Sequence, residues 1–349
     1  MQLVAYGAQD IYLTGNPQIT FFKVVYRRHT NFSMESIEQT INGSFSASGS
    51  KVTSTISRNG DLVGRLFVEM DPSVVFSTSD DAKVPWPTNS LLDEVEVEIG
   101  GQRIDRLYGH WLNTWAELTQ ETVAGPQLDS NGKYRTSIQA AAVNGEDIVP
   151  PTMWQRMTGN VKPGAIAFKE KNVFVDLPFW FCRNPGLALP LIALQYHEVK
   201  VSITTHDCSK LSVTAGSDFT SIKLWADYIY LDTDERRRFA QVSHEYLIEQ
   251  LQYQSEAPAS TFTLNFNHPV KELIWAGQRA DSASANGGYA NPMDIQIFSK
   301  AGPGNTSVAD EKLADSTTVT ATLKLNGHER FAPRQDNYST FFSSRRRHT

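Results

Sequence analysis

Apolar and polar residues alternate with a period of two in several short segments of the chain. Val95, Val97 and Ile99 alternate with glutamates. The same alternation recurs in residues 199–203, 261–266 and 322–325. This period places apolar side chains on one face of a pleated strand and polar side chains on the other. The pattern therefore predicts antiparallel sheets with one buried and one solvated face.

Turn-forming residues separate these segments. They occur at Asn59-Gly60, Gly100-Gly101, Asn131-Gly132, Asn144-Gly145, Asn184-Pro185-Gly186, Asn286-Gly287-Gly288 and Asn326-Gly327. Glycine and asparagine favour tight turns because they tolerate positive φ. Many short strands with frequent turns are typical of an all-β sandwich or barrel.

Two segments have helical rather than strand patterns. Leu107, Trp111, Trp115 and Leu118 share one helical face, which predicts a helix over residues 107–118. A second short helix is expected over residues 234–242, where acidic residues at its start suit the helix dipole.

The opening layout of the chain starts again about 200 residues later. Ile37-Glu38-Gln39 recurs as Ile248-Glu249-Gln250, Asp61-Leu62-Val63 as Glu272-Leu273-Ile274, and Ile99-Gly100-Gly101-Gln102 as Leu325-Asn326-Gly327-His328. The period is too long for a solenoid repeat and has the size of a domain. Long loops at residues 77–90 and 280–291 fall at matching places. The repeat predicts two similar domains in tandem.

Composition narrows the class of protein. The chain has 349 residues, of which 40% are apolar and 20% charged, so it can form a sizeable core. Its net charge of −6 argues against a large nucleic-acid surface. Only Cys182 and Cys208 are present, which implies no disulfide framework. No apolar run is long enough for a membrane span, and no signal peptide is expected.

Possible metal ligands are sparse. His206-Asp207-Cys208 could be a ligand or Cys–His cluster, but it follows a strand and we favour a loop. His244-Glu245 lacks the second histidine of a zinc-binding helix.

For the acidic residues, too, a structural role is favoured over metal binding or catalysis. Asp232, Asp234 and Glu235 could bind calcium, yet they lack EF-hand spacing and suit a capped helix in a linker. Glu94 and Glu96 lie on the polar face of a strand, where we expect a solvated face rather than a glycosidase pair.

Tryptophans and glycosylation sequons add little that is specific. Five tryptophans lie in apolar or alternating segments, namely Trp111, Trp115, Trp180, Trp225 and Trp275. We favour core packing for them, and a platform on which sugars stack is the alternative. The Asn-x-Ser/Thr sequons, whose use the sequence does not decide, are at Asn31, Asn42, Asn305 and Asn337.

Three longer segments resemble one known family. Residues 7–22 (GAQDIYLTGNPQITFF) and their continuation to Gln39 closely resemble the N-terminal arm of the major capsid proteins of nucleocytoplasmic large DNA viruses. Residues 177–186 (LPFWFCRNPG) and 232–250, which contain DTDERRRFA and HEYLIEQ, resemble two further hallmarks. The likeness covers most of the chain, from about Gly7 to about Phe331.

The resemblance implies an all-β fold of two tandem antiparallel jelly-roll sandwiches with a few short helices. The expected boundaries are an N-terminal arm at 1–30, a first jelly roll at 31–231, a linker at 232–247 and a partial second jelly roll at 248–349. The second copy has few residues left after Leu325, and the tail 343–349 is unlike the family. We therefore expect a truncated reading frame with an atypical tail.

The function implied by the resemblance is structural. Three chains would form a homotrimer, a pseudo-hexagonal tile of an icosahedral shell that contacts neighbouring capsomers and minor capsid proteins. We expect a virion protein assembled in the host cytoplasm, with no enzyme activity, cofactor, metal or direct nucleic-acid contact. The arm is expected to dock beneath the trimer or onto a neighbouring component. The alternatives are a carbohydrate-binding β-sandwich for host attachment and a cupin-like metalloenzyme.

Overall fold

The fold is taken from a computed structural model of the chain. It describes residues 31–76, 87–119, 172–208, 218–256 and 261–275, with short pieces within 127–135, 154–158, 216, 277–278, 295–296 and 320–335. The predicted arm at 1–30, the tail 343–349, residues 280–291 and most of the loop 77–90 lie outside the described residues. So do Asn305 and Asn337, whereas Asn31 and Asn42 are exposed.

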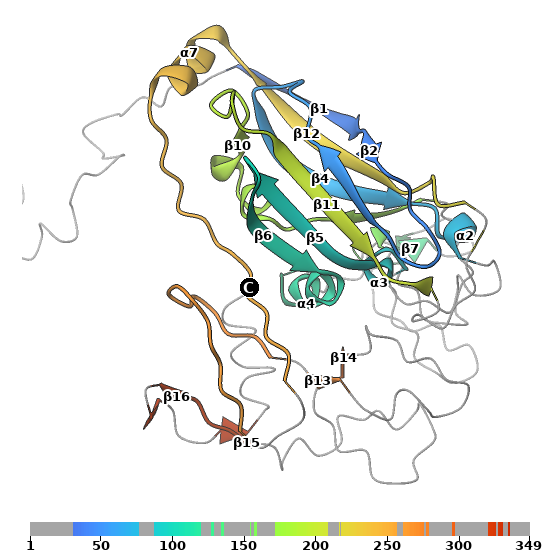
Figure 1. The fold of residues 1–349 in the computed structure, drawn as a ribbon, viewed down its shortest axis with the longest axis vertical. Helices are drawn as coiled ribbons and strands as arrows, with labels where there is room; N and C mark the ends of the chain where they lie inside the picture. The colour runs from blue at the N-terminus through green and yellow to red at the C-terminus, as the bar shows by residue number, and fades with distance from the viewer. Residues whose placement is uncertain are drawn as a thin grey trace, which may run out of the picture.

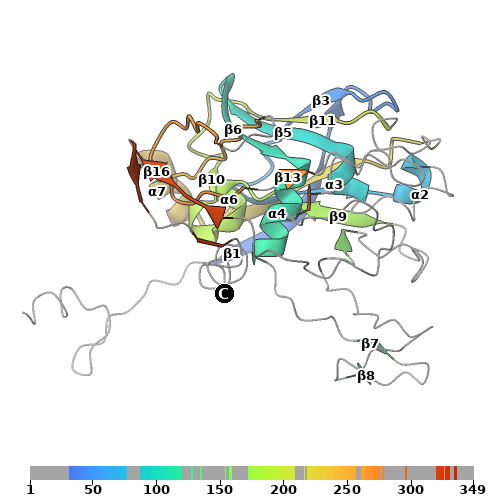
Figure 2. The same ribbon diagram turned by 90° about the horizontal axis from the view of Figure 1, so that it is seen from below.

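Two five-stranded antiparallel sheets lie face to face, and Figure 2 shows them as separate layers. Sheet A contains β1 (Phe32–Gln39), β12 (Lys223–Leu231) and β4 (Leu62–Met70), with β9 (Val173–Asp176) and β10 (Leu189–Pro190) both paired to β4. Sheet B contains, in order, β2 (Ile41–Asn42), β3 (Lys51–Thr55), β11 (Val199–Thr205), β5 (Leu92–Ile99) and β6 (Gln102–Tyr108).

The strand order is that of a jelly roll. If the two-residue edge strand β2 is left out of the count, and β9 with β10 count as one interrupted strand along β4, sheet A has the order first, eighth, third, sixth. Sheet B then has the order second, seventh, fourth, fifth. The first strand pairs along its whole length with the last, from Phe32 opposite Leu231 to Gln39 opposite Leu224. This double Greek key closes the sandwich around one core.

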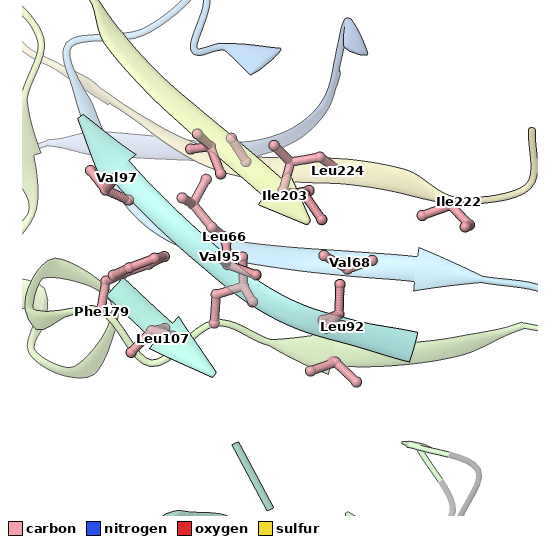
Figure 3. Close-up of a cluster of buried hydrophobic side chains, with 14 of the residues drawn as sticks. Leu66, Val68, Leu92, Val95, Val97, Leu107, Phe179, Ile203, Ile222 and Leu224 are labelled. Atoms are coloured by element: carbon pink, nitrogen blue, oxygen red, sulfur yellow. The ribbon is translucent and has the colours of Figure 1, made fainter. Parts of the chain in front are cut away.

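The core lies between the sheets and consists of the inward-facing residues of both (Figure 3). Val95 and Val97 on β5 face Leu66 on β4 and Leu224 on β12, and each is at most 1% exposed. Burial of one such side chain stabilises the fold by roughly 1.5–3 kcal/mol. The period-two prediction for the apolar positions of β5 and β11 is confirmed for their valines and Ile203, which are all buried, whereas Ile99 at the end of β5 is half-buried.

Glycines build the tight connection between β5 and β6. Ile99 pairs with Gln102, so the loop has only two residues, Gly100 and Gly101. Their φ angles are +61° and +81°. Two-residue hairpins with positive φ at both positions match the twist of the strands they join. The predicted turn is confirmed.

The same hairpin recurs in the second copy of the repeat. Leu325 pairs with His328, which leaves two residues in the loop, and Gly327 has a φ of +80°. The sequence repeat between residues 99–102 and 325–328 is therefore also a structural one. It is the clearest correspondence between the two parts of the chain.

Other predictions for the second copy are wrong within the described residues. Residues 261–266 form no strand, and Phe262 and Leu264 are 51% and 44% exposed. Side-chain amides replace a backbone ladder there, since Gln252 bonds to both the N–H and the C=O of Asn267. Gln254 likewise bonds to Thr263 and Asn265. Without a paired strand, alternation alone does not bury these side chains.

Helix α4 (Gly109–Thr119) begins later than predicted. Leu107 belongs to β6 and is buried in the sandwich core, so it is not part of the helix. The helix buries Leu112 and Ala116, whereas Trp111 and Trp115 are half-buried. Strand pairing with β5 holds Leu107 in the sheet and overrides the helical spacing.

Helix α7 (Thr233–Gln241) confirms the second predicted helix. Asp232 caps it by accepting a hydrogen bond from the Thr233 N–H, and Asp234 and Glu235 occupy its first turn. The side chain of Arg236 reaches back to Asp61 at 2.9 Å, which anchors the helix to the sandwich. Beyond it, the chain runs extended towards β6 (Figure 1).

The remaining elements are short. The helices are α2 (Pro72–Val75), α3 (Pro87–Leu91), α6 (Trp180–Arg183) and the 3-10 turn η2 (Pro185–Leu187). Two-residue ladders join β7 (Gln127–Leu128) to β8 (Tyr134–Arg135), β13 (Gly277–Gln278) to β14 (Ile295–Gln296), β15 (Thr320–Ala321) to β18 (Arg334–Gln335), and β16 (Lys324–Leu325) to β17 (His328–Glu329). Among the described residues, no helix has both the length and the apolar composition to cross a bilayer.

Candidate functional site

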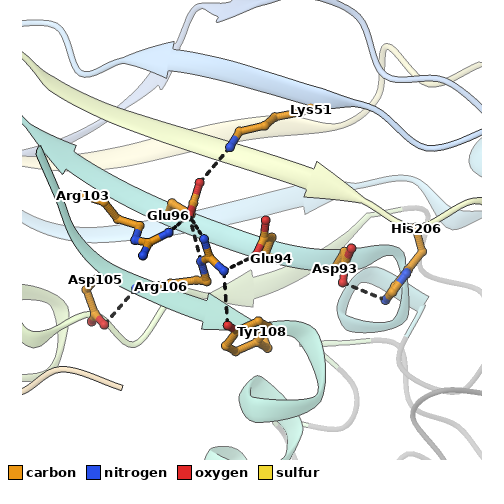
Figure 4. A network of polar contacts seen from close by, with 9 residues as sticks. All are labelled: Lys51, Asp93, Glu94, Glu96, Arg103, Asp105, Arg106, Tyr108 and His206. Carbon is orange, nitrogen blue, oxygen red and sulfur yellow. Dashed lines mark hydrogen bonds and ion pairs between the residues drawn. The ribbon is translucent and has the colours of Figure 1, made fainter. Parts of the chain in front are cut away.

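A network of charges covers the outer face of sheet B around Glu96 (Figure 4). The Glu96 carboxylate accepts from Lys51 at 2.8 Å, from Arg103 at 3.2 Å and from Arg106 at 2.6 Å. Arg106 also pairs with Glu94 at 3.1 Å. These side chains come from β3, β5 and β6, so the network joins β5 to its neighbour β6 and, across β11, to β3.

Glu96 is buried, which corrects the expectation of a solvated carboxylate. Its side chain is only 4% exposed because the three cations cover it. Burial alone would raise the pKa of Glu96, but the hydrogen bonds from Lys51, Arg106 and Arg103 outweigh burial and hold the pKa at about 2. A glycosidase acid needs a raised pKa. The network therefore fits a structural role, not acid catalysis.

The predicted loop around His206 does not gather metal ligands. The His206 ring lies 3.5 Å from the Asp93 carboxylate, and the backbone N–H groups of His206 and Cys208 bond to Leu91 and Ala47. Burial, with help from the charge of Asp207, raises the pKa of the Cys208 thiol, which disfavours the thiolate that metals bind. Within the described residues, no group of three histidine, cysteine or acidic side chains could hold a metal.

The residues of the linker also have structural partners. The His244 ring stacks on Phe239, and its Nε2 lies 2.9 Å from the Phe239 carbonyl oxygen. Asp232 is committed to the cap of α7. The interpretation of these residues as a capped helix, rather than a calcium site, agrees with this geometry.

The start of the second copy packs against the first sandwich. We call residues 248–253 the strap. Its Leu251 N–H donates to the Asp105 carboxylate at 3.1 Å, and its Gln250 side chain donates to the Ile104 carbonyl at 2.5 Å. Tyr253 packs on the rings of Tyr108 and His110, with centroids 4.9 and 5.0 Å apart. The strap thus lies along β6, the edge strand of sheet B.

A second contact fixes the strap electrostatically. Its Glu249 pairs with Arg183 of α6 at 3.0 Å and also with Lys271. The Arg183 guanidinium in turn lies 5.2 Å from the ring centre of Trp115 on α4. Hydrogen bonds from Lys271 and the nearby charges lower the pKa of Glu249, against a smaller effect of burial. The two copies are therefore joined by apolar, hydrogen-bonded and ionic contacts.

Asp105, the centre of this contact, was not singled out by sequence reasoning. It is 3% exposed, and burial raises its pKa to about 6 although two backbone N–H groups bond to it. Asp105 and Leu107 are two residues apart on β6, so both point to the buried side. The sequence could have revealed this burial, because Asp105 lies two residues from the apolar Leu107 and in a strand shares its face.

The tryptophans divide between core and surface. Trp180 is buried, as predicted, but Trp275 is 53% exposed, so the core interpretation is wrong for it. Trp225 is half-buried on the outer face of sheet A, where it stacks on Phe67 and donates to Glu69 at 2.7 Å.

The fold and these contacts define a class of protein. Charged side chains form pairs across strands, and the contacts around Asp105 join one repeat to the next. This is a jelly-roll protein whose charged side chains serve structure.

Two family models match the chain. The "Major capsid protein N-terminus" family matches residues 20–232, and the "Large eukaryotic DNA virus major capsid protein" family matches residues 235–346. The major capsid protein of Pyramimonas orientalis virus is 51% identical over 97% of this chain and 73% of its own length. That of Paramecium bursaria Chlorella virus 1 is 42% identical over 97% and 75%. That of Phaeocystis pouchetii virus is 47% identical over 80% and 58%.

A solved structure agrees with these relatives. VP54 of PBCV-1, fitted into a reconstruction of the virophage Sputnik, superposes with a TM-score of 0.62 at 35% identity over 93% of this chain and 76% of that one. The chain belongs to the major capsid proteins of large eukaryotic DNA viruses, and it is a structural capsid protein. The expected resemblance and the tandem jelly-roll fold class are confirmed.

Proposed function

We propose that this chain forms a homotrimeric capsomer, in which three copies with two sandwiches each make a pseudo-hexagonal tile. The tandem hairpins at Gly101 and Gly327 carry the proposal, because they place the same structural unit twice in one chain. Contacts in a three-fold ring are heterologous and close on themselves. Obligate interfaces of this kind usually bury more than about 2,000 Å².

The strap supports the same proposal. It holds the second unit against β6 of the first through Asp105, and against α6 through Glu249. A fixed angle between two similar units is what a near-hexagonal outline needs, since six units alternate around the ring. We place the domain boundaries at residues 31–231 and 248–349, with the linker at 232–247.

The partners and place of assembly extend this proposal. Tiles of this kind meet neighbouring capsomers and minor capsid proteins at their sides, without a direct contact to nucleic acid. The negative net charge of the chain supports this view. We propose that assembly takes place in the host cytoplasm.

Native mass spectrometry and negative-stain electron microscopy test the proposal together. The expected mass is three times the 39.0 kDa chain, with hexagonal outlines in projection. A stable monomer or a two-fold dimer at micromolar concentration would contradict it. A metal content near one per chain, or specific binding on a glycan array, would instead favour the metalloenzyme or carbohydrate-binding alternatives.

A further inference from the structure

The outer faces of the two sheets differ in chemistry. Sheet B presents the charge network around Glu96 to its surroundings. Sheet A presents large apolar side chains on four neighbouring strands, namely Phe32 and Met34 on β1, Trp225, Ile229 and Leu231 on β12, Phe67 on β4 and Phe174 on β9. We call this set the sheet A patch. An apolar surface spread over several strands marks a place where something docks.

An aromatic row crosses the patch. The rings of Trp225 and Phe67 stack with centroids 6.2 Å apart and an interplanar angle of 4°. Phe174 meets Phe67 edge-on, also at 6.2 Å. At the other end of the patch, Phe32 and Met34 are 65% and 57% exposed. The described residues therefore leave the β1 end of the patch open.

The strap and helix α7 lie away from the patch. The strap contacts β6 at the edge of sheet B, through Asp105 and Ile104. Helix α7 is anchored at Asp61, at the end of the sandwich. Neither segment supplies a cover for Phe32 and Met34.

The nearest segment of chain outside the described residues enters at the patch itself. Residues 20–30 lead through Asn31 into β1, which begins at Phe32. The distance from Phe32 to Phe174 is about 30 Å, if eight residues of rise along a strand and three strand spacings are combined. Ten extended residues reach at most about 33 Å. After the turn that reverses its direction, a segment of this length can cover the β1 and β12 side of the patch.

The segment and the patch also match in charge and polarity. Residues 20–30 (TFFKVVYRRHT) contain three cations, Lys23, Arg27 and Arg28, and no carboxylate. The patch carries four carboxylates, at Glu38, Glu69, Asp176 and Asp227, against the two cations Arg65 and Lys223. The apolar residues of the segment, Phe21, Phe22, Val24, Val25 and Tyr26, supply a surface that water disfavours.

We infer that residues 20–30 fold back over the outer face of sheet A of their own chain and cover the β1 and β12 side of the sheet A patch. Because residues 20–30 are too few to extend far, they favour a contact with the chain's own sheet A over the contact with a neighbouring component that the sequence predicts. The inference does not depend on the trimer, because the covering segment and the patch belong to one chain.

Photo-cross-linking tests this contact directly. Met34 is replaced by p-benzoyl-phenylalanine in the full chain, and 14N- and 15N-labelled chains are mixed and assembled before irradiation. The expected cross-links join position 34 to residues 20–30 in pairs of the same isotope only. The additional substitutions Arg27→Glu and Arg28→Glu should lower their yield at least fivefold. The matched control carries the same photo-reactive residue at Thr53, on the outer face of β3, and should give no such product.

Two results would overturn the inference. Cross-links in mixed-isotope pairs would assign the patch to a neighbouring copy, and absence of any product with residues 20–30 would remove them from the patch altogether. Native mass spectrometry of the same samples reports the trimer independently. A failed trimer and a failed docking contact can therefore be told apart.

Discussion

The carboxylate of Asp105 accepts a hydrogen bond from the backbone N–H of Leu251 at 3.1 Å, across 146 positions of sequence. It also accepts one from the N–H of Arg106 at 2.9 Å. One buried side chain thus joins the edge strand of the first jelly roll to the start of the second copy. Because this carboxylate is nearly inaccessible to water, its charge affects stability.

The Asp105 contact predicts a pH dependence of stability. Burial raises the pKa of Asp105 to about 6 in the folded protein, above its ordinary value of 3.8. The folded state then holds the proton more tightly than the unfolded state, so this group stabilises the fold below pH 4 and loses that contribution as the pH rises through 6. At about 1.4 kcal/mol per pH unit, the change is roughly 3 kcal/mol.

The substitution Asp105→Asn should remove this dependence, because the amide oxygen still accepts from Leu251 but carries no charge. Urea unfolding between pH 4 and 7 measures it, with Glu98→Gln on β5 as the charge-matched control. An unchanged pH slope in the Asp105→Asn variant would contradict the assignment.

Glu96 predicts the opposite pH behaviour. Its pKa of about 2 lies below the ordinary value, so its contribution is present above pH 4.5 and disappears as the pH falls through 2. The variant Glu96→Gln should lose about 2 kcal/mol at neutral pH, because three cations lose a buried partner but Lys51 and Arg103 remain half-exposed to water. Glu94→Gln, which has one ion pair in the network, should lose less than about 1 kcal/mol. Equal losses in the two variants, measured by chemical denaturation, would argue against a special role for burial.

The two glycines of the β5–β6 hairpin allow the cost of backbone strain to be measured separately from the cost of a steric clash. A Cβ at Gly100 would lie 2.7 Å from Nδ1 of His197, whereas a Cβ at Gly101 would meet nothing within 4 Å. Both residues have positive φ, so Gly101→Ala should cost about 1 kcal/mol from backbone strain alone. Gly100→Ala should cost more, because the His197 ring must also move. Thermal unfolding ranks the two variants, and a lower melting temperature for Gly101→Ala would refute this account.

Limited proteolysis should cut the chain between α7 and the strap. Residues 242–247 are extended and form no ladder, while α7 is anchored to the sandwich through Arg236 and Asp61. Segments with few backbone hydrogen bonds open and are cleaved first. We expect a resistant fragment that ends close to residue 241, identified by intact-mass measurement. Persistence of the full-length chain under the same conditions would show that this segment is protected in the assembly.

The sequence predicted most of the first sandwich because local and tertiary preferences agree there. Val95 and Val97 alternate with glutamates and lie in the core, and Gly100-Gly101 forms the expected two-residue turn. Asp232 caps α7 as its position before acidic residues suggested. In each case the residue type that suits the local backbone also suits its place in the folded structure.

The failures arise where distant partners decide the outcome. Leu107 has helical spacing to Trp111, but β5 holds it in a strand. Phe262 has strand alternation, yet no neighbouring strand pairs with it among the described residues. Glu96 is buried because three cations from two other strands converge on it, which alternation along its own strand does not reveal.

The pairing of β1 with β12 has a consequence for synthesis of the chain. Phe32 cannot find Leu231 until about two hundred further residues have been translated. At roughly 5–20 residues per second, the first strand waits for on the order of ten seconds or more before its partner leaves the ribosome. During that interval the edge of β1, which carries Phe32 and Met34, lacks its partner strand and can associate with other nascent chains.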